Sequence, residues 1–310
     1  MGKYDNVYDD IFQTLRYFHP RLFIPYINQH FGKNYSMDAK IQLAARDGRL
    51  IEKNADGSLD QIARESDMIV IIDNDPYLIE CQSYNDEMEI RIAEYAFMSA
   101  KNRAYKDEQG RMVINMPPYS IIFVRSNSNT PKETKLVFRF PNNQEVEYSC
   151  ENTLLYDMSK EDIIKNRLYP FIPYYIARYE KLIKDESADI SIVLEELQYL
   201  YDHVMKWIES GDITNDEAND LKESGRWLIE HIADGNTNQE RMVDQMGGRI
   251  IITTTQKLLM DKWAEGRAEG RKEGAAERKA LEDKNDALEG ENARLRAQLA
   301  EAGIDITQQK

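Results

Sequence analysis

The sequence predicts an α/β protein with a mixed β-sheet flanked by helices, followed by an α-helical region and a C-terminal coiled coil. Two short apolar runs within residues 67–82 are separated by turn-forming residues, which predicts a strand hairpin. Helical periodicity before and after this hairpin places helices against the strands. Near the C-terminus, leucines recur every seven residues, which is the repeat of a coiled coil.

The first 150 residues form one predicted domain with the order helix, strands, helix, strands. Apolar residues at helical spacing predict the helices, and turn residues around positions 47–48 and 56–57 predict a loop or short hairpin. The predicted elements are helices over 4–18, after Pro25 and from Met88 to about Tyr105, and strands over Ser120–Val124, Leu136–Phe140 and Glu145–Tyr148.

Residues 151–255 form a second predicted region that is almost wholly helical. A broad apolar stripe over 189–209 predicts one long amphipathic helix. Two later helices begin with predicted capping boxes, from Thr214 to Glu217 and from Thr237 to Glu240. This region is interpreted as a helical extension that docks either on the first domain or on a partner.

Residues 256–278 form a connector with Glu-Gly-Arg repeats, in which Gly266, Gly270 and Gly274 are four residues apart. Each glycine costs an isolated helix about 1 kcal/mol relative to alanine. The segment is therefore either a flexible linker or a helix whose glycine face packs closely on another helix. We favour a helical connector, because helix-forming sequence flanks it on both sides.

The last predicted segment, residues 279–303, is a short coiled coil. Leucines from Leu281 to Leu295 occupy one core position of the heptad, and Asn285 and Asn292 occupy the other. Buried asparagine at that second position favours parallel dimers in a fixed register. The segment predicts a parallel homodimer, and the alternative is a solvated single helix.

The formal net charge is −15, which is unusual for a protein that binds nucleic acid. The acidity lies mostly in residues 151–255, which carry 11 basic and 21 acidic side chains, against 18 and 22 in residues 1–150. Basic residues within 101–111 predict either a local basic edge for DNA or a solvated helix face.

Cysteine content and hydropathy predict a cytoplasmic protein with no membrane partner. Cys81 and Cys150 are too few for a disulfide framework. No apolar run approaches the roughly 18 residues of a membrane span, and the N-terminus has no signal-peptide pattern. Four scattered histidines and the lack of a glycine-rich phosphate loop argue against zinc and nucleotide cofactors.

The strand hairpin carries two acids, Asp67 and Glu80, in an otherwise apolar segment. A two-residue loop at positions 73–74 would set Asp67 directly opposite Glu80. Opposed residues on paired strands hold their Cβ atoms about 4.5–5.5 Å apart. Two carboxylates at that distance can share one divalent metal ion.

Gln82 belongs to the same predicted face as Glu80, because side chains alternate along a strand. The two carboxylates would repel each other, and an oxygen-preferring ion such as Mg²⁺ removes that conflict. The alternative is a surface hairpin whose polar face carries acids, which is common on antiparallel sheets.

Three segments together resemble a known nuclease core: Arg64–Asp67, Tyr77–Ser83 and Arg91–Tyr95. They are similar to the PD-(D/E)XK nuclease superfamily, and more narrowly to the bacterial Rpn group of recombination-promoting nucleases and putative transposases. In that group glutamine replaces the usual lysine. The opening Tyr4–Tyr8 and the Glu-Gly-Arg repeats also resemble that group, and the likeness covers residues 4 to about 150.

The resemblance implies a restriction-endonuclease-like sheet in which Asp67 and Glu80 bind Mg²⁺ or Mn²⁺. It implies that Gln82 orients or polarises the attacking water. By the same analogy, Arg91 steadies the scissile phosphate or the acidic cluster, and Tyr95 packs below it.

The expected function is metal-dependent DNA endonuclease activity, linked to recombination or mobile elements, in a dimer whose two sites address two strands. Asp9 departs from the resemblance, since related openings often carry a basic residue there. Asp5 is a candidate helix-borne acid for the site, and helix capping is its other role. The alternative function is a catalytically weak or inactive nuclease-fold protein that acts as a dimeric assembly module.

Overall fold

The computed structural model describes residues 6–44, 47–53, 59–83, 88–127 and 129–246. All of them fall within one compact unit that spans Met1–Ile250. The predicted connector over 256–278, the predicted coiled coil over 279–303 and the candidate acid Asp5 lie outside the described residues.

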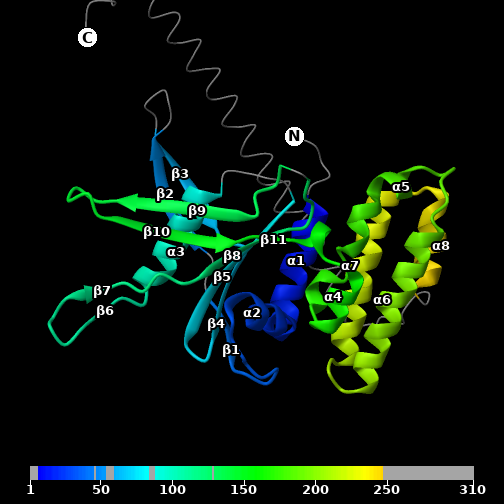
Figure 1. Cartoon of the computed structure of the whole chain (residues 1–310), viewed down its shortest axis with the longest axis horizontal. Helices are drawn as coiled ribbons and strands as arrows, with labels where there is room; N and C mark the ends of the chain where they lie inside the picture. Colours follow the sequence, from blue (N-terminus) through cyan, green and yellow to red (C-terminus); the bar gives the residue numbers. More distant parts are fainter. Residues whose placement is uncertain (1–5, 45–46, 54–58, 84–87, 128, 247–310) are drawn as a thin grey trace, which may run out of the picture. The chain divides into compact units, whose positions relative to one another are not determined.

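A five-stranded mixed sheet forms the centre of the unit (Figure 1). The first three strands pair antiparallel, whereas the last two pair parallel to their neighbours. This arrangement confirms the predicted mixed sheet. In spatial order the strands are β1 (Ile41–Leu43), β4 (Met68–Ile72), β5 (Asp75–Gln82), β8 (Tyr119–Phe123) and β11 (Thr153–Leu154).

Helices cover both faces of the sheet, because strand residues alternate between two apolar clusters. Met68, Val70 and Ile79 belong to the cluster that contains α1 (Asn6–Phe18) and α2 (Ile24–Phe31). Ile69 and Leu78, which alternate with them, belong to the cluster built on α3 (Glu89–Lys101). Each buried strand therefore carries apolar side chains on both faces, as strands covered by helices on both sides require.

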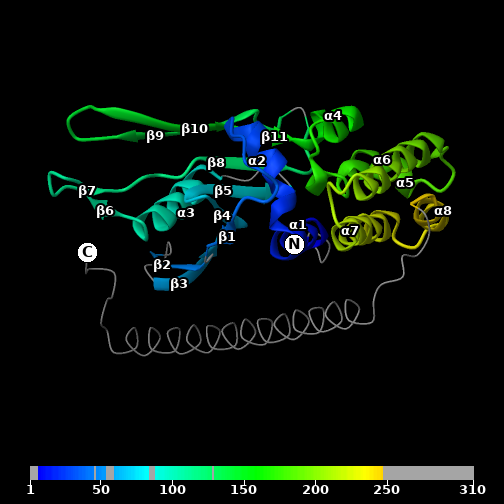
Figure 2. The same ribbon diagram turned by 90° about the horizontal axis from the view of Figure 1, so that it is seen from below.

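Three hairpins form separate two-stranded sheets beside the main one. In Figures 1 and 2, the hairpins β6–β7 and β9–β10 extend on the side away from the long helices α6 (Ser191–Glu209) and α7 (Asn215–Ala233). The predicted strands near 136–148 belong to the third hairpin and do not join the main sheet. The pairs are β2 (Asp47–Lys53) with β3 (Leu59–Glu65), β6 (Tyr105–Lys106) with β7 (Met112–Val113), and β9 (Glu133–Arg139) with β10 (Glu145–Glu151).

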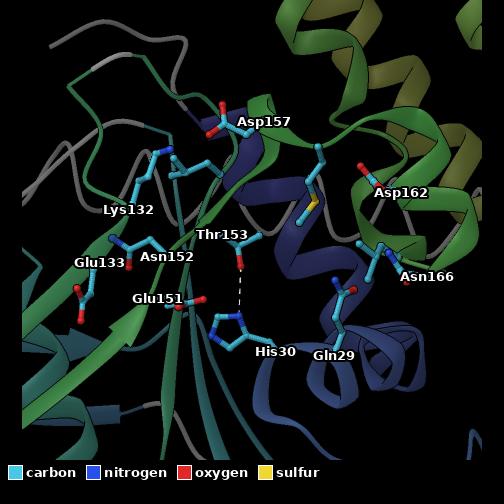
Figure 3. Close-up of a pocket in the computed structure, with 13 residues that line it drawn as sticks. Gln29, His30, Lys132, Glu133, Glu151, Asn152, Thr153, Asp157, Asp162 and Asn166 are labelled. Atoms are coloured by element: carbon cyan, nitrogen blue, oxygen red, sulfur yellow. Dashed lines mark hydrogen bonds between the residues drawn. The ribbon is translucent and has the colours of Figure 1, made fainter.

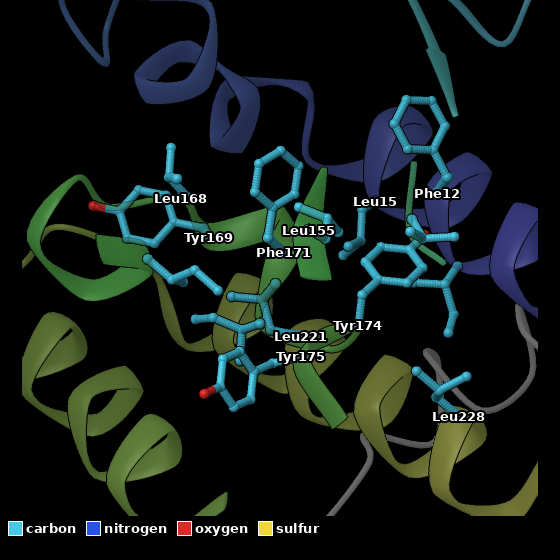
Figure 4. Packing of buried hydrophobic residues seen from close by; sticks show 14 of the residues in the cluster. Phe12, Leu15, Leu155, Leu168, Tyr169, Phe171, Tyr174, Tyr175, Leu221 and Leu228 are labelled. Carbon is cyan, nitrogen blue, oxygen red and sulfur yellow. The ribbon is translucent and has the colours of Figure 1, made fainter. Parts of the chain in front are cut away.

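From Leu155 to residue 246 the described chain is helical, as predicted, and packs directly on α1. Figure 4 shows side chains of α1, the segment 155–175 and α7 in one buried cluster, with Tyr174 between α1 and α7. The elements are the 3₁₀ turns η1 (Pro20–Phe23), η2 (Leu155–Asp157), η3 (Tyr169–Phe171) and η4 (Tyr175–Tyr179), and the helices α4 (Lys160–Lys165), α5 (Glu180–Lys184), α6 (Ser191–Glu209), α7 (Asn215–Ala233) and α8 (Thr237–Gln245).

Two side-chain pairs fasten residues 19–21 to α7. Arg21 donates two hydrogen bonds to the carboxylate of Glu217, and His19 Nε2 lies 2.6 Å from Asp220 Oδ2. A bidentate guanidinium–carboxylate pair fixes geometry as well as adding energy. The helical region therefore docks on the first domain, which is one of the two alternatives that the sequence left open.

The structure corrects three details of the predicted elements. The main sheet extends past the predicted boundary at residue 150, because Thr153–Leu154 pairs with β8 as strand β11. Helix α3 ends at Lys101, before the predicted end near Tyr105, which lies in β6. The cap of α8 is Asn236, whose side chain accepts from the Asn238 N–H, so the capping box predicted at Thr237 is wrong.

The other predicted capping box is present at the start of α7. The Thr214 hydroxyl accepts from the Glu217 N–H, and the Glu217 carboxylate accepts from the Thr214 N–H. Both bonds satisfy backbone donors that have no partner within the helix. Glu217 therefore serves the cap of α7 and the ion pair with Arg21 at the same time.

His30 on α2 makes stability depend on pH. Its Nδ1 lies 3.4 Å from Thr153 Oγ1, and burial lowers the pKa of the imidazole from 6.5 to about 4. The unfolded chain therefore binds a proton first as the pH falls, so stability is lost from about pH 6.5 downward. At pH 5 we expect the free energy of unfolding, measured with urea, to be about 2 kcal/mol lower than at pH 7.5. The variant His30→Gln should not show this loss.

The matched control for this prediction is His203→Gln on α6. The His203 Nδ1 lies 2.8 Å from the Tyr199 carbonyl one helical turn away, in a partly exposed setting. This variant shows whether removing a histidine from another helix changes the pH dependence in the same way. Identical pH slopes for the wild type and His30→Gln would contradict the assignment.

Candidate active site

The β4–β5 hairpin has the predicted register. Its strands pair from Met68 with Ile79 to Ile72 with Asp75. The two loop residues, at 73 and 74, have positive φ angles of 49° and 78°. Two positive φ angles are the signature of the tight hairpin turn that matches strand twist. Continued by one residue, this register sets the residue before β4 opposite Glu80.

Asp67 and Glu80 bond to each other's strands. The Asp67 N–H donates to Glu80 Oε1 over 3.0 Å, and the Cys81 N–H donates to Asp67 Oδ2 over 2.8 Å. Glu80 is fully buried, whereas Asp67 is partly exposed. The predicted meeting of the two acids is therefore present, and each carboxylate also holds the strand end together.

Gln82 lies on the same side of β5 as Glu80. Its neighbour on β8 is Phe123, and the neighbour of Glu80 is Ile121. Both neighbours belong to the cluster under α3. The three predicted catalytic residues therefore share one face. Gln82 is partly exposed and is the last residue of β5.

Arg91 and Tyr95 lie one helical turn apart on α3, above this face. Arg91 Nε and Nη2 lie 3.4 Å and 3.3 Å from the Tyr95 hydroxyl. Burial acts to lower the pKa of Arg91, but the Tyr95 hydroxyl and the charges of Glu80 and Asp67 outweigh it, and the pKa is raised. The guanidinium therefore stays charged beside the two acids.

Tyr95 is buried, and the Arg91 guanidinium lies over its ring, 5.9 Å from the ring centroid. Burial raises the pKa of the Tyr95 hydroxyl, and the charges of Glu80 and Asp67 raise it too. The Arg91 guanidinium acts to lower this pKa but is outweighed. A neutral hydroxyl at this place keeps its proton over the physiological range. It can hold the guanidinium without adding a further charge to the site.

Asp9 on α1 is an acid whose position sequence reasoning did not anticipate. It lies on the Cys81 side of β5, where its charge contributes to raising the pKa of the Cys81 thiol, after burial and Asp67. The Gln13 side chain donates to Asp9 Oδ1 over 3.1 Å. Asp9 follows Asp5, the candidate acid named from the sequence, by four residues.

The carboxylates of Asp67 and Glu80 are the acidic groups that the hairpin brings together. Among the described residues, no three His, Cys, Asp or Glu side chains are close enough together to hold a metal ion. The site therefore offers two carboxylates. A carboxylate has about four lone-pair positions, so a bond from a backbone N–H does not prevent it from binding a cation. Mg²⁺ in particular is often held by one or two carboxylates and keeps several waters.

A separate polar cavity of about 580 Å³ lies between α2, the base of the β9–β10 hairpin and α4 (Figure 3). His30 and Thr153 are joined by a hydrogen bond in its wall. None of the predicted site residues lines this cavity. The candidate active site and this cavity are therefore distinct features of the unit.

A scan against protein-family models, a search of curated proteins and a search of solved structures each found no match. In the part of the chain that the structure describes, no helix combines the length and apolar character needed to cross a membrane.

The structural role of Asp67 can be separated from its chemistry. Asp67→Ala removes the acceptor of the Cys81 N–H, and an unsatisfied buried donor costs about 1–3 kcal/mol. Asp67→Asn keeps an oxygen in that place, so we expect it to lose less than half as much stability in urea unfolding. Equal losses for the two variants would show that this hydrogen bond does not hold the hairpin.

Proposed function

We propose that the protein is a metal-dependent DNA endonuclease whose site is formed by Asp67, Glu80 and Gln82. The observation that carries the proposal is the hairpin register, which brings both acids to one point on the α3 face. The resemblance to PD-(D/E)XK nucleases and their Rpn group supports the same residues. The cellular role suggested by that resemblance is recombination or the movement of mobile elements.

In this proposal, Asp67 and Glu80 hold Mg²⁺ or Mn²⁺. When bound, the ion would supply charge stabilisation and a more acidic water for phosphodiester hydrolysis. Gln82 orients the attacking water through its carboxamide, which can both donate and accept. It carries no charge and cannot serve as a base at neutral pH.

Arg91 is the group in this site that can bind the scissile phosphate. Its guanidinium presents several N–H donors in a fixed fork that matches phosphate oxygens. Tyr95 holds Arg91 through its hydroxyl, so Tyr95 acts as a positioning residue. The positive charge of Arg91 would stabilise the negative charge that develops on the phosphate during in-line attack.

The proposal includes a cytoplasmic protein that forms a parallel homodimer through residues 279–303. Both cysteines are free, Cys81 in a buried position and Cys150 in a half-buried one, which suits a reducing compartment. Two copies would bring two sites to one DNA molecule, so that each site can cut one strand.

Purified full-length protein should cleave plasmid DNA in the presence of Mg²⁺ or Mn²⁺. We expect Asp67→Asn and Glu80→Gln to lower the cleavage rate about 100-fold or more, because each removes one negative charge from the ion site. Glu145→Gln on the exposed β9–β10 hairpin is the matched control and should retain the wild-type rate. Cleavage that survives both site changes would place the chemistry elsewhere.

Metal binding can be tested without any nucleic acid. An ion that binds only the folded state raises its stability by mass action. We expect millimolar Mg²⁺ to raise the Tm of the wild type and of Glu145→Gln, but not that of Asp67→Asn or Glu80→Gln. An equal rise in all four proteins would assign the ion to another place.

A specific observation favours the second function, an assembly module that keeps the nuclease fold. Both acids accept backbone N–H bonds, which gives them a purely structural use. Absence of cleavage on DNA and RNA, together with no Mg²⁺ effect on Tm, would favour this second function. A thermal response to Mg²⁺ without cleavage would instead indicate a different substrate.

A further inference from the structure

Exposed large apolar side chains are concentrated in one stretch of the described sequence, which contains α3 and the β6–β7 and β9–β10 hairpins. Nine of its fourteen exposed large apolar residues lie between positions 90 and 146, with exposed fractions of 37–63%. Concentrations of this kind mark interaction surfaces more often than scattered single residues do. The nine are Ile90, Phe97, Tyr105, Met112, Ile114, Val137, Phe138, Phe140 and Val146.

The β9–β10 hairpin, which carries four of these residues, has an open edge. The Asn152 N–H donates to the Lys132 carbonyl over 2.8 Å, and the Phe140 N–H donates to the Gln144 carbonyl over 2.8 Å. Hydrogen-bonded pairs alternate along an antiparallel ladder, so the even-numbered residues of β9 bond to β10. The N–H and C=O groups of residues 133, 135, 137 and 139 therefore point to the other edge.

No described strand pairs with that edge, because β9 and β10 form a two-stranded sheet by themselves. An edge of this kind is a template for pairing with another chain. Pro131 and Pro141 lie just beyond the two ends of β9. Proline has no N–H to donate, so these residues confine pairing to the strand between them.

The charges on β9 match those of a second, antiparallel copy of β9. With Leu136 at the two-fold axis, Glu133 lies opposite the partner's Arg139. Sliding the partner by two residues in either direction opposes Lys135 with another Lys135 or with Arg139. Opposite charges across strands stabilise pairing, and like charges weaken it.

Strand β10 lacks this self-complementarity. The residues of β10 whose backbone N–H and C=O groups point away from β9 include Glu145, Glu147 and Glu151. Two antiparallel copies of β10 centred on Tyr148 would oppose Glu145 with the partner's Glu151. This repulsion protects the β10 edge from self-association.

We propose that two copies of this chain pair along β9, antiparallel about Leu136, to form a four-stranded sheet with β10 at both outer edges. The partner is a second copy because the only β9 register that uses the whole strand is also the one whose charges are complementary. In this register Val137 lies opposite the partner's Lys135, and Phe138 lies opposite the partner's Thr134. The proposal does not depend on nuclease activity.

Cysteine cross-linking in the full-length chain tests the register. In the proposed pair, Leu136 and the partner's Leu136 form a non-hydrogen-bonded pair with Cα atoms about 4.5 Å apart, within disulfide range. We expect Leu136→Cys to cross-link under mild oxidation about tenfold faster than Asn142→Cys at the hairpin tip. In the proposed pair, residue 142 does not lie opposite residue 142 of the partner. Equal rates, or no cross-link at position 136, would overturn the proposal.

A charge swap supplies an independent measurement by sedimentation of the full-length chain. Glu133→Arg or Arg139→Glu alone places like charges opposite each other twice per dimer, so we expect about a tenfold weaker dimer. The double variant restores opposite charges and should return the dissociation constant to within about threefold of the wild type. Both residues are exposed, and within the chain Glu133 pairs with Lys135 and Arg139 pairs with Glu145. Circular dichroism of each variant checks that its fold matches that of the wild type.

Two sedimentation results would overturn the proposal: a chain that is monomeric at every concentration, or a dimer indifferent to both single changes. Hydrogen exchange of the β9 amides tests the competing occupant. Protection that rises with protein concentration supports the second copy. Protection that appears only with an added single-stranded oligonucleotide would assign the edge to nucleic acid and refute pairing.

Discussion

The register of the β4–β5 hairpin is the constraint on which the rest of the described structure depends. A slip of one residue would move every side chain to the opposite face. Val70 and Ile79 would then leave the cluster under α1, and Glu80 would leave the face of Arg91. The tight loop, with left-handed φ angles at both central residues, excludes such a slip. Core packing and site geometry are therefore consequences of the same turn.

Stability alone does not account for the acids in this hairpin. A fully buried carboxylate carries a large desolvation cost unless it is paired and hydrogen-bonded. Glu80 accepts the Asp67 N–H and interacts with the Arg91 charge, which offsets part of that cost. Apolar residues of similar volume often hold such positions equally well or better. Packing alone therefore does not explain paired acids at this strand end.

The hairpin was predictable because its signals are local: strand alternation and a two-residue turn between apolar runs. Strand β11 was not, because its two residues pair with β8 some thirty positions earlier and carry no pattern of their own. The cap of α8 was misplaced by one residue because Asn236 and Thr237 are both good caps. Asp9 was not recognised near β5 because only packing of α1 on the sheet brings it there.

The open edge of β9 is connected to the candidate site through rigid contacts. The Tyr119 hydroxyl on β8 donates to the Thr134 carbonyl over 3.0 Å, which fixes β9 on the main sheet. Strand β8 is in turn hydrogen-bonded to β5, where Glu80 lies beside Ile121. A second copy held at β9 would therefore keep two sites at a set separation. With the proposed nuclease activity, two sites at a fixed separation would let each copy address one strand of the same duplex.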